Sequence, residues 1–248
     1  MRLAALYDIH GNLPALEAVL GDIRRAGVER IVVGGDVVPG PMPRETMDCL
    51  LDLDIPTQFI LGNGDREVLN MMRGVETGAI PEQFVEPMRW NAQQLGPEDD
   101  RRIAGWPATL RMDVPDIGSV LFCHATPRND IDIFTRQTPA ERLEPLFRDA
   151  GAALVVCGHT HMQFDRKIGS TRVVNAGSVG MPFGEPGAYW LLIESTITLR
   201  HTRFDSARAA ERIRATTYPQ AEEFAARNVV NPPNEQDMLD VFNRAALK

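Results

Sequence analysis

The apolar and polar positions in the first third of the chain follow two alternating patterns. Short apolar runs typical of buried strands occupy residues 2–7, 29–36 and 57–61. Over residues 13–27, apolar positions recur at three- and four-residue spacing, which predicts an amphipathic helix. A second helix is predicted after the second run, with Pro43 in its first turn. Strands that alternate with helices in this way favour a parallel sheet.

The rest of the chain predicts a different organisation. Residues from about 66 to 106 show helical spacing and no strand pattern, which predicts a helical cap or insertion. Beyond them, short apolar runs separated by Gly, Pro and Ser-Thr turns predict hairpins, beginning with one at 109–124. The tail from about 205 to 248 is predicted to be a helical extension, broken by the sequence NPPN.

Together these patterns predict a single mixed α/β domain over residues 1–248. One sheet entered by crossovers and another built from hairpins, with helices outside, would form a four-layer α-β-β-α sandwich of two mixed sheets. The C-terminal helix either packs on a sheet or makes a contact in an oligomer, and the sequence leaves both open.

Composition and charge narrow the classes of partner. The 248 residues are 44% hydrophobic and 24% charged, which is ordinary for a globular protein. The net charge of −8 argues against stable binding to duplex nucleic acid or to an anionic membrane surface. It does not argue against a phosphorylated substrate, because bound metal ions reverse the local sign of the charge.

Three features predict a cytoplasmic protein. The cysteines, Cys49, Cys123 and Cys157, form no CxxC pair, and their odd number argues against a disulfide framework. The apolar run at the N-terminus is too short for a secretion signal. No later run approaches the length of a membrane-spanning helix, so no membrane partner is expected.

Polar residues with metal-binding chemistry follow the predicted strands. Because the carboxyl ends of strands in an α/β sheet face one crevice, we expect these side chains to converge. Four of the five histidines in the chain stand at such strand ends. The candidate ligands are Asp8, His10, Asp36, Asn63, His124, His159 and His161. Imidazole with carboxylate is a donor set for Mn, Fe, Zn, Ni or Co, and seven donors suit two ions roughly 3.5–4 Å apart that share a carboxylate.

The motifs that contain these residues resemble those of the calcineurin-like metallophosphoesterases. The motifs are DIHGN at 8–12, GGD at 34–36, GNGD at 62–65, a histidine at 124 and GHTH at 158–161. A further segment, NAGSVG, is similar to one in the small bacterial and archaeal phosphodiesterases of that superfamily. The ordered set covers about residues 1–200 and leaves out the C-terminal helices.

The resemblance implies a dinuclear centre and a reaction. It places Asp8, His10, Asp36 and His161 on the first ion, and Asp36, Asn63, His124 and His159 on the second. Asp36 would then bridge the two ions. Mn²⁺ is the first expectation for both, with Fe, Zn, Ni or Co as alternatives. The implied nucleophile is a hydroxide that bridges the metals, with Asp36 and His124 as the catalytic residues of the chain.

One position departs from the family pattern. Most of the superfamily has a histidine after the asparagine of the GNGD motif, where this chain has Gly64. A phosphomonoester is a dianion and benefits from an added cation, whereas a diester carries a single charge. We therefore expect the substrate to be a phosphodiester small molecule or nucleotide. Two alternatives stay open: a phosphomonoesterase or protein phosphatase, and a non-catalytic metal-binding scaffold like the retromer subunit that resembles these enzymes.

Residues beside the motifs are candidates for substrate binding. Asn12 either contacts phosphate or caps the helix that follows it. Asn175 either contacts the substrate or holds a loop near the metals. Arg66 and Arg128 follow motif residues and are candidates for phosphate binding.

Three further expectations concern the surroundings of the centre. Asp65 either orients a ligand or begins a helix. Substrate specificity is expected to lie in residues 65–135, which the resemblance constrains least. His201 lies inside a predicted strand and is expected to be structural.

Overall fold

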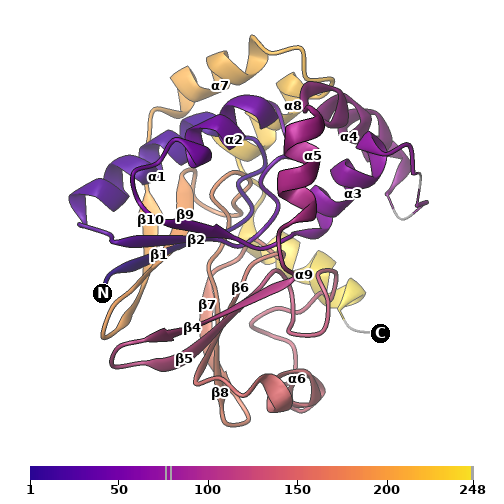
Figure 1. The fold of residues 1–248 in the computed structure, drawn as a ribbon. Helices are drawn as coiled ribbons and strands as arrows, with labels where there is room; N and C mark the ends of the chain where they lie inside the picture. Colours follow the sequence, from indigo (N-terminus) through magenta and orange to yellow (C-terminus); the bar gives the residue numbers. More distant parts are fainter. Residues whose placement is uncertain (76, 79, 247–248) are drawn as a thin grey trace.

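Two five-stranded sheets stack face to face in the computed structural model, which describes residues 1–75, 77–78 and 80–246 (Figure 1). The strands of the first sheet are β1 (Leu3–Leu6), β2 (Arg30–Val33), β3 (Thr57–Phe59), β9 (Ala188–Ile193) and β10 (Ile197–Thr202). The strands of the second sheet are β4 (Thr109–Val114), β5 (Gly118–Cys123), β6 (Leu154–Cys157), β7 (Phe164–Ile168) and β8 (Thr171–Asn175). The strand order is β10-β9-β1-β2-β3 in the first sheet and β4-β5-β6-β8-β7 in the second.

Both sheets are mixed, as the sequence predicts. Strands β1, β2 and β3 run parallel, and β9 is antiparallel to both β1 and β10. In the second sheet β5, β6 and β8 run parallel, whereas β4 and β7 join the edges as antiparallel strands. The hairpin of β9 and β10 therefore completes the crossover sheet and does not add to the sheet that contains the other hairpins.

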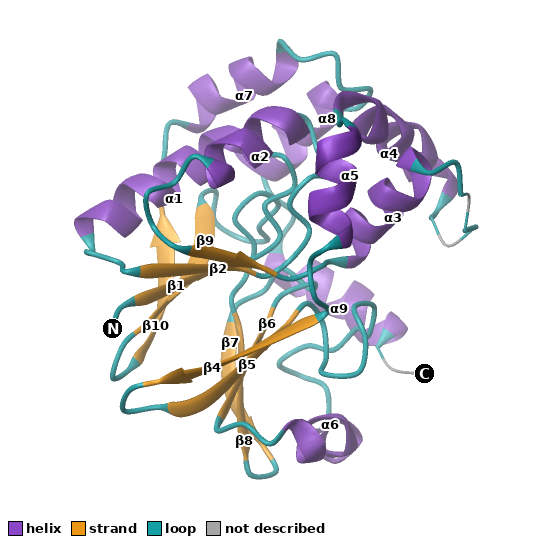
Figure 2. Ribbon diagram, viewed as in Figure 1, coloured by secondary structure: helices purple, strands orange, loops and turns teal. Residues whose placement is uncertain are grey.

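Helices cover the outer faces of both sheets, which gives four layers (Figure 2). Helices α1 (Leu13–Arg25) and α2 (Pro43–Leu51) pack on the first sheet, and α6 (Ala140–Phe147) packs on the second. A third core lies between the sheets, to which the strands contribute alternate residues such as Ala5 and Val156. The α-β-β-α sandwich predicted from the sequence is confirmed.

Three helices lie between β3 and β4, in the stretch where the sequence shows helical spacing. They are α3 (Asn63–Met72), α4 (Glu82–Gln94) and α5 (Pro97–Ala104). Because α3 begins at Asn63, this residue belongs to the first turn of a helix, and the prediction that it ends a strand is wrong. The cause is Asp65, whose carboxylate accepts the N–H of Gly62 and so caps the helix at this point.

The C-terminal extension follows β10. It consists of α7 (Ser206–Arg214), α8 (Ala221–Phe224), a π-helical turn (Ala225–Val230) and α9 (Glu235–Ala245). Nε2 of Gln220 donates a hydrogen bond to the carbonyl oxygen of Gln83 in α4, over 2.9 Å. On the other side, Oγ1 of Thr135 donates to Oδ1 of Asn243 in α9, over 2.8 Å. The extension is therefore anchored both to the helices after β3 and to the loop before α6.

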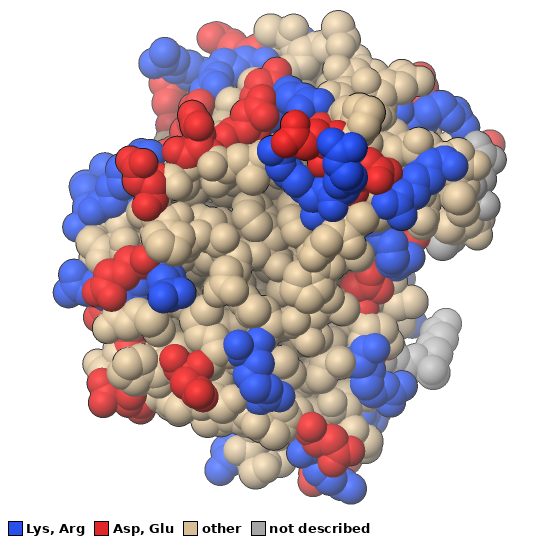
Figure 3. All heavy atoms as spheres, viewed as in Figure 1, with Lys and Arg blue, Asp and Glu red and all other residues tan. Residues whose placement is uncertain are grey.

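Charged side chains of both signs are interspersed on the face of the molecule shown in Figure 3. Several of them form ion pairs, for example Arg73 with Asp100 and Arg212 with Glu17. Charge interspersed in this way offers no extended basic surface to a nucleic acid on this face. Among the described residues, no helix combines the length and the apolar character needed to cross a bilayer.

Candidate metal centre

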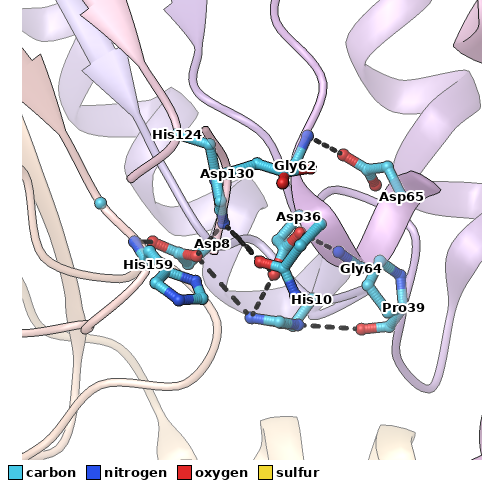
Figure 4. A network of polar contacts seen from close by, with 12 residues as sticks. Asp8, His10, Asp36, Pro39, Gly62, Gly64, Asp65, His124, Asp130 and His159 are labelled. Atoms are coloured by element: carbon cyan, nitrogen blue, oxygen red, sulfur yellow. Dashed lines mark hydrogen bonds and ion pairs between the residues drawn. The ribbon is translucent and has the colours of Figure 1, made fainter. Parts of the chain in front are cut away.

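All seven candidate ligands lie in one cluster at the carboxyl ends of the strands. Figure 4 shows Asp8, His10, Asp36, His124 and His159 among them. The loop after β1 brings Asp8 and His10, and the loop after β2 brings Asp36. His124 directly follows β5, while His159 and His161 follow β6. Asn63 reaches the cluster from the first turn of α3. Strand ends of both sheets thus contribute to a single site.

One half of the cluster is formed by Asp8, His10 and His161. Nε2 of His10 lies 3.3 Å from Nε2 of His161, and Oδ1 of Asp8 lies 3.4 Å from the same nitrogen of His161. Oδ2 of Asp36 is 3.8 Å from Nε2 of His10. The donor atoms of Asp8, His10 and His161 lie close enough together for one cation to contact them at once.

The other half is formed around His124. Oδ2 of Asp36 lies 3.7 Å from Nε2 of His124, so this carboxylate faces both halves of the cluster. The side-chain oxygen of Asn63 lies 3.0 Å from Nε2 of His124 and 3.0 Å from Nδ1 of His159. With a cation bound here, the amide oxygen would face the ion, as in this orientation. In the opposite orientation the NH₂ group would instead donate to the ring nitrogens of His124 and His159.

Backbone carbonyl groups fix the orientation of three of the four rings. Nδ1 of His10 donates to the oxygen of Pro39 at 3.2 Å, and Nδ1 of His124 donates to the oxygen of Gly34 at 2.9 Å. Nδ1 of His161 donates to the oxygen of Met181 at 2.7 Å. In a neutral ring that donates from Nδ1, Nε2 carries a lone pair. In their neutral form these three rings therefore aim their Nε2 lone pairs into the cluster, in the manner of metal-binding histidines.

The chemistry of the donors fits metal ions. Oδ1 of Asp8 is fully buried and has no hydrogen-bond partner within the described part of the chain. A buried carboxylate oxygen without a partner is costly, and so are two facing lone pairs on His10 and His161. A divalent cation between these atoms removes both costs. Two overlapping sets of donors can each contact one ion, and Asp8 belongs to both.

The backbone of the ligands is unusual. Among the described residues other than glycine, six have φ in the left-handed region, and five of these are candidate ligands. The five are Asp8 (52°), His10 (50°), Asp36 (52°), His159 (65°) and His161 (59°). Such a conformation costs about 1–3 kcal/mol for a residue with a side chain and clusters at functional sites. The sequence pattern gave no indication of this strain.

Burial and charge set the protonation of the rings. Burial lowers the pKa of His159 to about 4, helped by the charge of His124, and burial also lowers the pKa of His10. Burial acts in the same direction on His124 and His161, but the neighbouring carboxylates outweigh it and raise the pKa of both rings. His10 and His159 are therefore held as neutral bases, which bind a cation without first losing a proton.

Asp65 ties two of the ligand-bearing loops together. Its side chain is fully buried, and Oδ1 accepts the N–H groups of Val37 at 2.8 Å and Val38 at 3.0 Å. Burial raises the pKa of Asp65 to about 7, with a further contribution from Asp36. Of the two roles left open by the sequence, Asp65 fills both: it caps α3 through Gly62 and holds the loop that carries Asp36.

The surroundings of Gly64 explain why this residue is glycine. Its N–H donates to Oδ1 of Asp36 at 2.7 Å. A Cβ built at this position would lie 2.7 Å from Cγ of Pro39 and 3.0 Å from Oδ1 of Asp36. The first distance is well inside the contact distance of about 3.5–4.0 Å between carbon atoms. The ring of Pro39 therefore fills the space that a side chain at position 64 would need.

Two of the predicted substrate-binding residues are buried and serve the structure. Oδ1 of Asn12 accepts the N–H of Ala15, and its Nδ2 donates to the oxygen of Gly180. This confirms the capping role of Asn12, and both polar atoms of its amide have partners within the protein. Nδ2 of Asn175 donates to the oxygen of Gly158 at 2.6 Å, which holds the loop that carries two histidines.

The two predicted phosphate-binding arginines differ. The guanidinium of Arg66 forms two hydrogen bonds with Asp130, at 2.8 and 3.2 Å, and a third with Glu67. Its charge is thus already paired within the protein. The side chain of Arg128 is exposed and has no hydrogen bond or ion pair with another described residue. His201 lies outside the cluster, where Nε2 contacts the oxygen of Pro186.

Several groups that shape the site were not found from the sequence. They include the carbonyl oxygens of Gly34, Pro39 and Met181, which orient the rings. Any residue can supply a carbonyl oxygen, so the residue type carries no signal for this role. Oγ of Ser178, which donates to the oxygen of Asp8 at 2.7 Å, lies in the NAGSVG motif, and the motif is the one signal that pointed to it.

A sandwich with carboxylates and imidazoles at its strand ends defines a metal-dependent phosphoesterase. The chain belongs to the calcineurin-like phosphoesterase superfamily, because the model of that superfamily domain matches residues 1–196. An uncharacterized protein of Methanocaldococcus jannaschii, MJ0912, is 26% identical over 249 residues, which cover 88% of this chain and 94% of that protein. The match confirms the family resemblance of the sequence motifs and supports a metal-dependent hydrolase.

Solved structures share the fold over most of the chain. A hypothetical protein of Pyrococcus horikoshii OT3, PH1004, superposes with a TM-score of 0.79 at 20% identity, covering 94% of this chain and 99% of that one. A metallophosphoesterase from Sphaerobacter thermophilus superposes with a TM-score of 0.71 at 25% identity, covering 92% and 99%. The two structures extend the likeness of the fold beyond the region that the superfamily model matches.

Proposed function

We propose that this protein hydrolyses phosphodiesters with two divalent metal ions held by the cluster at the strand ends. The observation that carries the proposal is the convergence of ring lone pairs on the buried, unpartnered Oδ1 of Asp8. The residues that would hold the ions are Asp8, His10, Asp36, Asn63, His124, His159 and His161. We propose Mn²⁺ for both ions, with Fe, Zn, Ni or Co as alternatives that the same donors accept.

When bound, divalent ions polarise phosphoryl oxygens and lower the pKa of a water molecule toward neutrality. The chain itself contributes the geometry. Asp36 faces both halves of the cluster through Oδ2, while its Oδ1 is held by the N–H of Gly64. His124 is held by the carbonyl of Gly34 and keeps Nε2 directed at the same point. We therefore propose Asp36 and His124 as the catalytic residues of the chain.

The charge around the cluster supports a diester over a monoester. A cavity of 420 Å³ adjoins the cluster, and Arg227 is the one arginine or lysine among the described residues that line it. Arg227 is paired with Glu223 at 3.4 Å, and Asp36 also faces this cavity. A phosphomonoester dianion meets little positive charge from the chain there, whereas a diester brings one negative charge fewer.

The first test is a paired assay on metal-free protein reloaded with Mn²⁺. Bis-p-nitrophenyl phosphate and p-nitrophenyl phosphate are compared for the wild type, Asp36→Asn and the control Asp149→Asn, whose side chain is exposed on the far side of the second sheet. We expect faster turnover of the diester, loss of metal and activity in Asp36→Asn, and no change in the control.

Each alternative function gives a different result in that assay. Equal or faster turnover of the monoester would overturn the diester proposal in favour of a phosphatase. No turnover of either ester by metal-loaded protein would favour a scaffold on the same fold. We also propose a cytoplasmic location, supported by the three free cysteines, two of which are buried.

A further inference from the structure

The cavity of 420 Å³ beside the metal centre has the features of a specificity pocket. Four of its lining residues, His10, Asp36, Asn63 and Gly64, belong to the cluster or its first helical turn. A larger cavity of 790 Å³ lies nearby, but His161 is the one candidate ligand that it touches. A substrate whose phosphate is held at the centre would therefore extend into the smaller cavity.

The walls of this pocket are mainly apolar and aromatic. Helix α4 contributes Phe84 and Met88, and the loop after β8 contributes Phe183. Phe183 stacks on the ring of His161, with centroids 5.5 Å apart and an interplanar angle of 22°. The apolar wall is thus continuous with a candidate metal ligand.

Another part of the wall comes from the C-terminal extension. Tyr218, Phe224 and Met238 line it, and the ring of Tyr218 packs edge-on against Trp90 of α4, with centroids 5.3 Å apart. The model of the superfamily domain ends at residue 196, so this wall lies outside the part of the chain that defines the family. Several aromatic rings in the lining of a cavity of this size favour a planar aromatic ring as its ligand.

The pocket also has a polar edge. Asn228 lines it from the π-helical turn, and its amide has no hydrogen bond to any other residue that the structure describes. Arg227 of the same turn forms an ion pair with Glu223 of α8. Turns of π-helix occur often at functional sites. A free amide offers both a donor and an acceptor to the edge of a heterocyclic ring.

We propose that this pocket binds one ester group of the substrate, a planar aromatic ring with a hydrogen-bonding edge, of the size of a nucleobase. This inference rests on the proposed phosphodiester chemistry and names the substrate class for it. A volume of 420 Å³ lies within the range of small-molecule pockets, about 300–1,000 Å³, and accommodates a small molecule and no folded macromolecule. Phe84 is 44% exposed at this pocket, so the bound ring would cover an apolar side chain that now faces solvent.

The test measures binding by calorimetry to Mn²⁺-loaded protein, separately from turnover. Three phosphodiester monoanions are compared: dimethyl phosphate, methyl phenyl phosphate and thymidine 5′-methyl phosphate. We expect the dissociation constant to fall about tenfold from the first to the second, because stacking of one ring contributes about five- to 150-fold. A further fall is expected for the nucleoside ester, because its ring has a polar edge.

Two variants and a control assign the effect to the pocket. Phe84→Ala should reduce the preference for both ring-bearing esters over dimethyl phosphate, and Asn228→Ala should reduce the preference for the nucleoside ester over the phenyl ester. Val241→Ala, which removes an exposed side chain from α9 outside the pocket, should change neither ratio.

The outcomes separate this inference from the proposed function. Equal dissociation constants for the three esters would overturn the inference, even if bis-p-nitrophenyl phosphate is hydrolysed. Suppose that the nucleoside ester binds no more tightly than the phenyl ester and that Asn228→Ala changes neither affinity. That result would refute the claim that Asn228 forms hydrogen bonds with the edge of the bound ring. Absence of hydrolysis with the expected order of binding would refute the proposed chemistry and leave the pocket assignment standing.

Discussion

Replacement of Gly64 by alanine tests the packing of the metal centre. Gly64 lies in the first turn of α3, and its φ is outside the left-handed region, so its backbone accepts any residue. At an open helical position the change from glycine to alanine stabilises a protein by up to about 1 kcal/mol. Gly64 is not open, because the new Cβ would lie 2.7 Å from Cγ of Pro39.

The size of the effect follows from that distance. Carbon atoms in contact stand about 3.5–4.0 Å apart, so Pro39 or the helix must move by about 1 Å. Movement of Pro39 would disturb the carbonyl that holds His10, and movement of the helix would stretch the 2.7 Å hydrogen bond from Gly64 to Asp36. Overpacking of this kind costs about 1–3 kcal/mol. For a chain of this length, each kcal/mol lowers Tm by about 2–4 °C.

The assay is scanning calorimetry of metal-free protein in a double-mutant cycle. Gly64→Ala should lower Tm, and Pro39→Ala should remove the ring that obstructs the new Cβ. The loss in free energy of unfolding of the double variant should therefore be smaller, by at least about 0.5 kcal/mol, than the sum of the losses of the two single variants. Gly21→Ala is the matched control, because a Cβ there meets Arg25 at an ordinary 3.5 Å and should raise Tm slightly. A rise in Tm for Gly64→Ala, or additive effects in the cycle, would refute the reasoning. The same obstacle means that a histidine at position 64 requires the Pro39→Ala background.

Three further predictions concern metal binding, protonation and capping. Chelation of the metal should lower Tm by about 5–10 °C, because ions at 100 times their dissociation constant stabilise the fold by about 2.7 kcal/mol. A Tm that does not change when chelator is added would contradict a metal site in the cluster. The raised pKa of Asp65, about 7, means that its contribution to stability is complete below about pH 4 and is lost as pH rises through 7. The Tm of the metal-free wild type minus the Tm of metal-free Asp65→Asn should therefore decrease between about pH 4 and about pH 8. A difference that does not change with pH would contradict a proton bound to buried Asp65. Asn12→Ala should lower the free energy of unfolding by about 1 kcal/mol, because the helix loses its N-cap, and should leave KM unchanged. Chemical denaturation measures the first, and a raised KM would instead support a role of Asn12 in substrate binding.

Much of the fold could be predicted because each element of the sandwich has a face that must be buried. The hairpin predicted at 109–124 contains β4 and β5, and alternation along β4 reflects one face turned to the core between the sheets. The run predicted at 57–61 extends two residues beyond β3. Periodicity could not locate that boundary, because the capping of α3 by Asp65 ends the extended segment and depends on a local hydrogen bond.

The candidate ligands could be chosen from the sequence because strand ends meet at one edge of a sheet. The packing around them could not, since it depends on residues far apart in the chain, such as Pro39 against position 64. The pocket shows the same limit. Substrate specificity was expected in residues 65–135, but Phe183, Tyr218 and Met238 form much of the pocket wall. Tyr218 and Met238 could not be predicted as neighbours of α4, because the return of the C-terminal extension to α4 leaves no periodic signal in the sequence.

The strained backbone of the ligands bears on how the centre works. Left-handed residues persist only where the surrounding structure holds them, and here the hydrogen bonds run between different loops. The N–H of His10 donates to the oxygen of Asp36 at 2.8 Å, and the N–H of His159 donates to Oδ2 of Asp8 at 2.9 Å. Each ligand-bearing loop is thus fixed by another one. Because the protein has already ordered these groups in folding, metal binding would not have to spend free energy on ordering them.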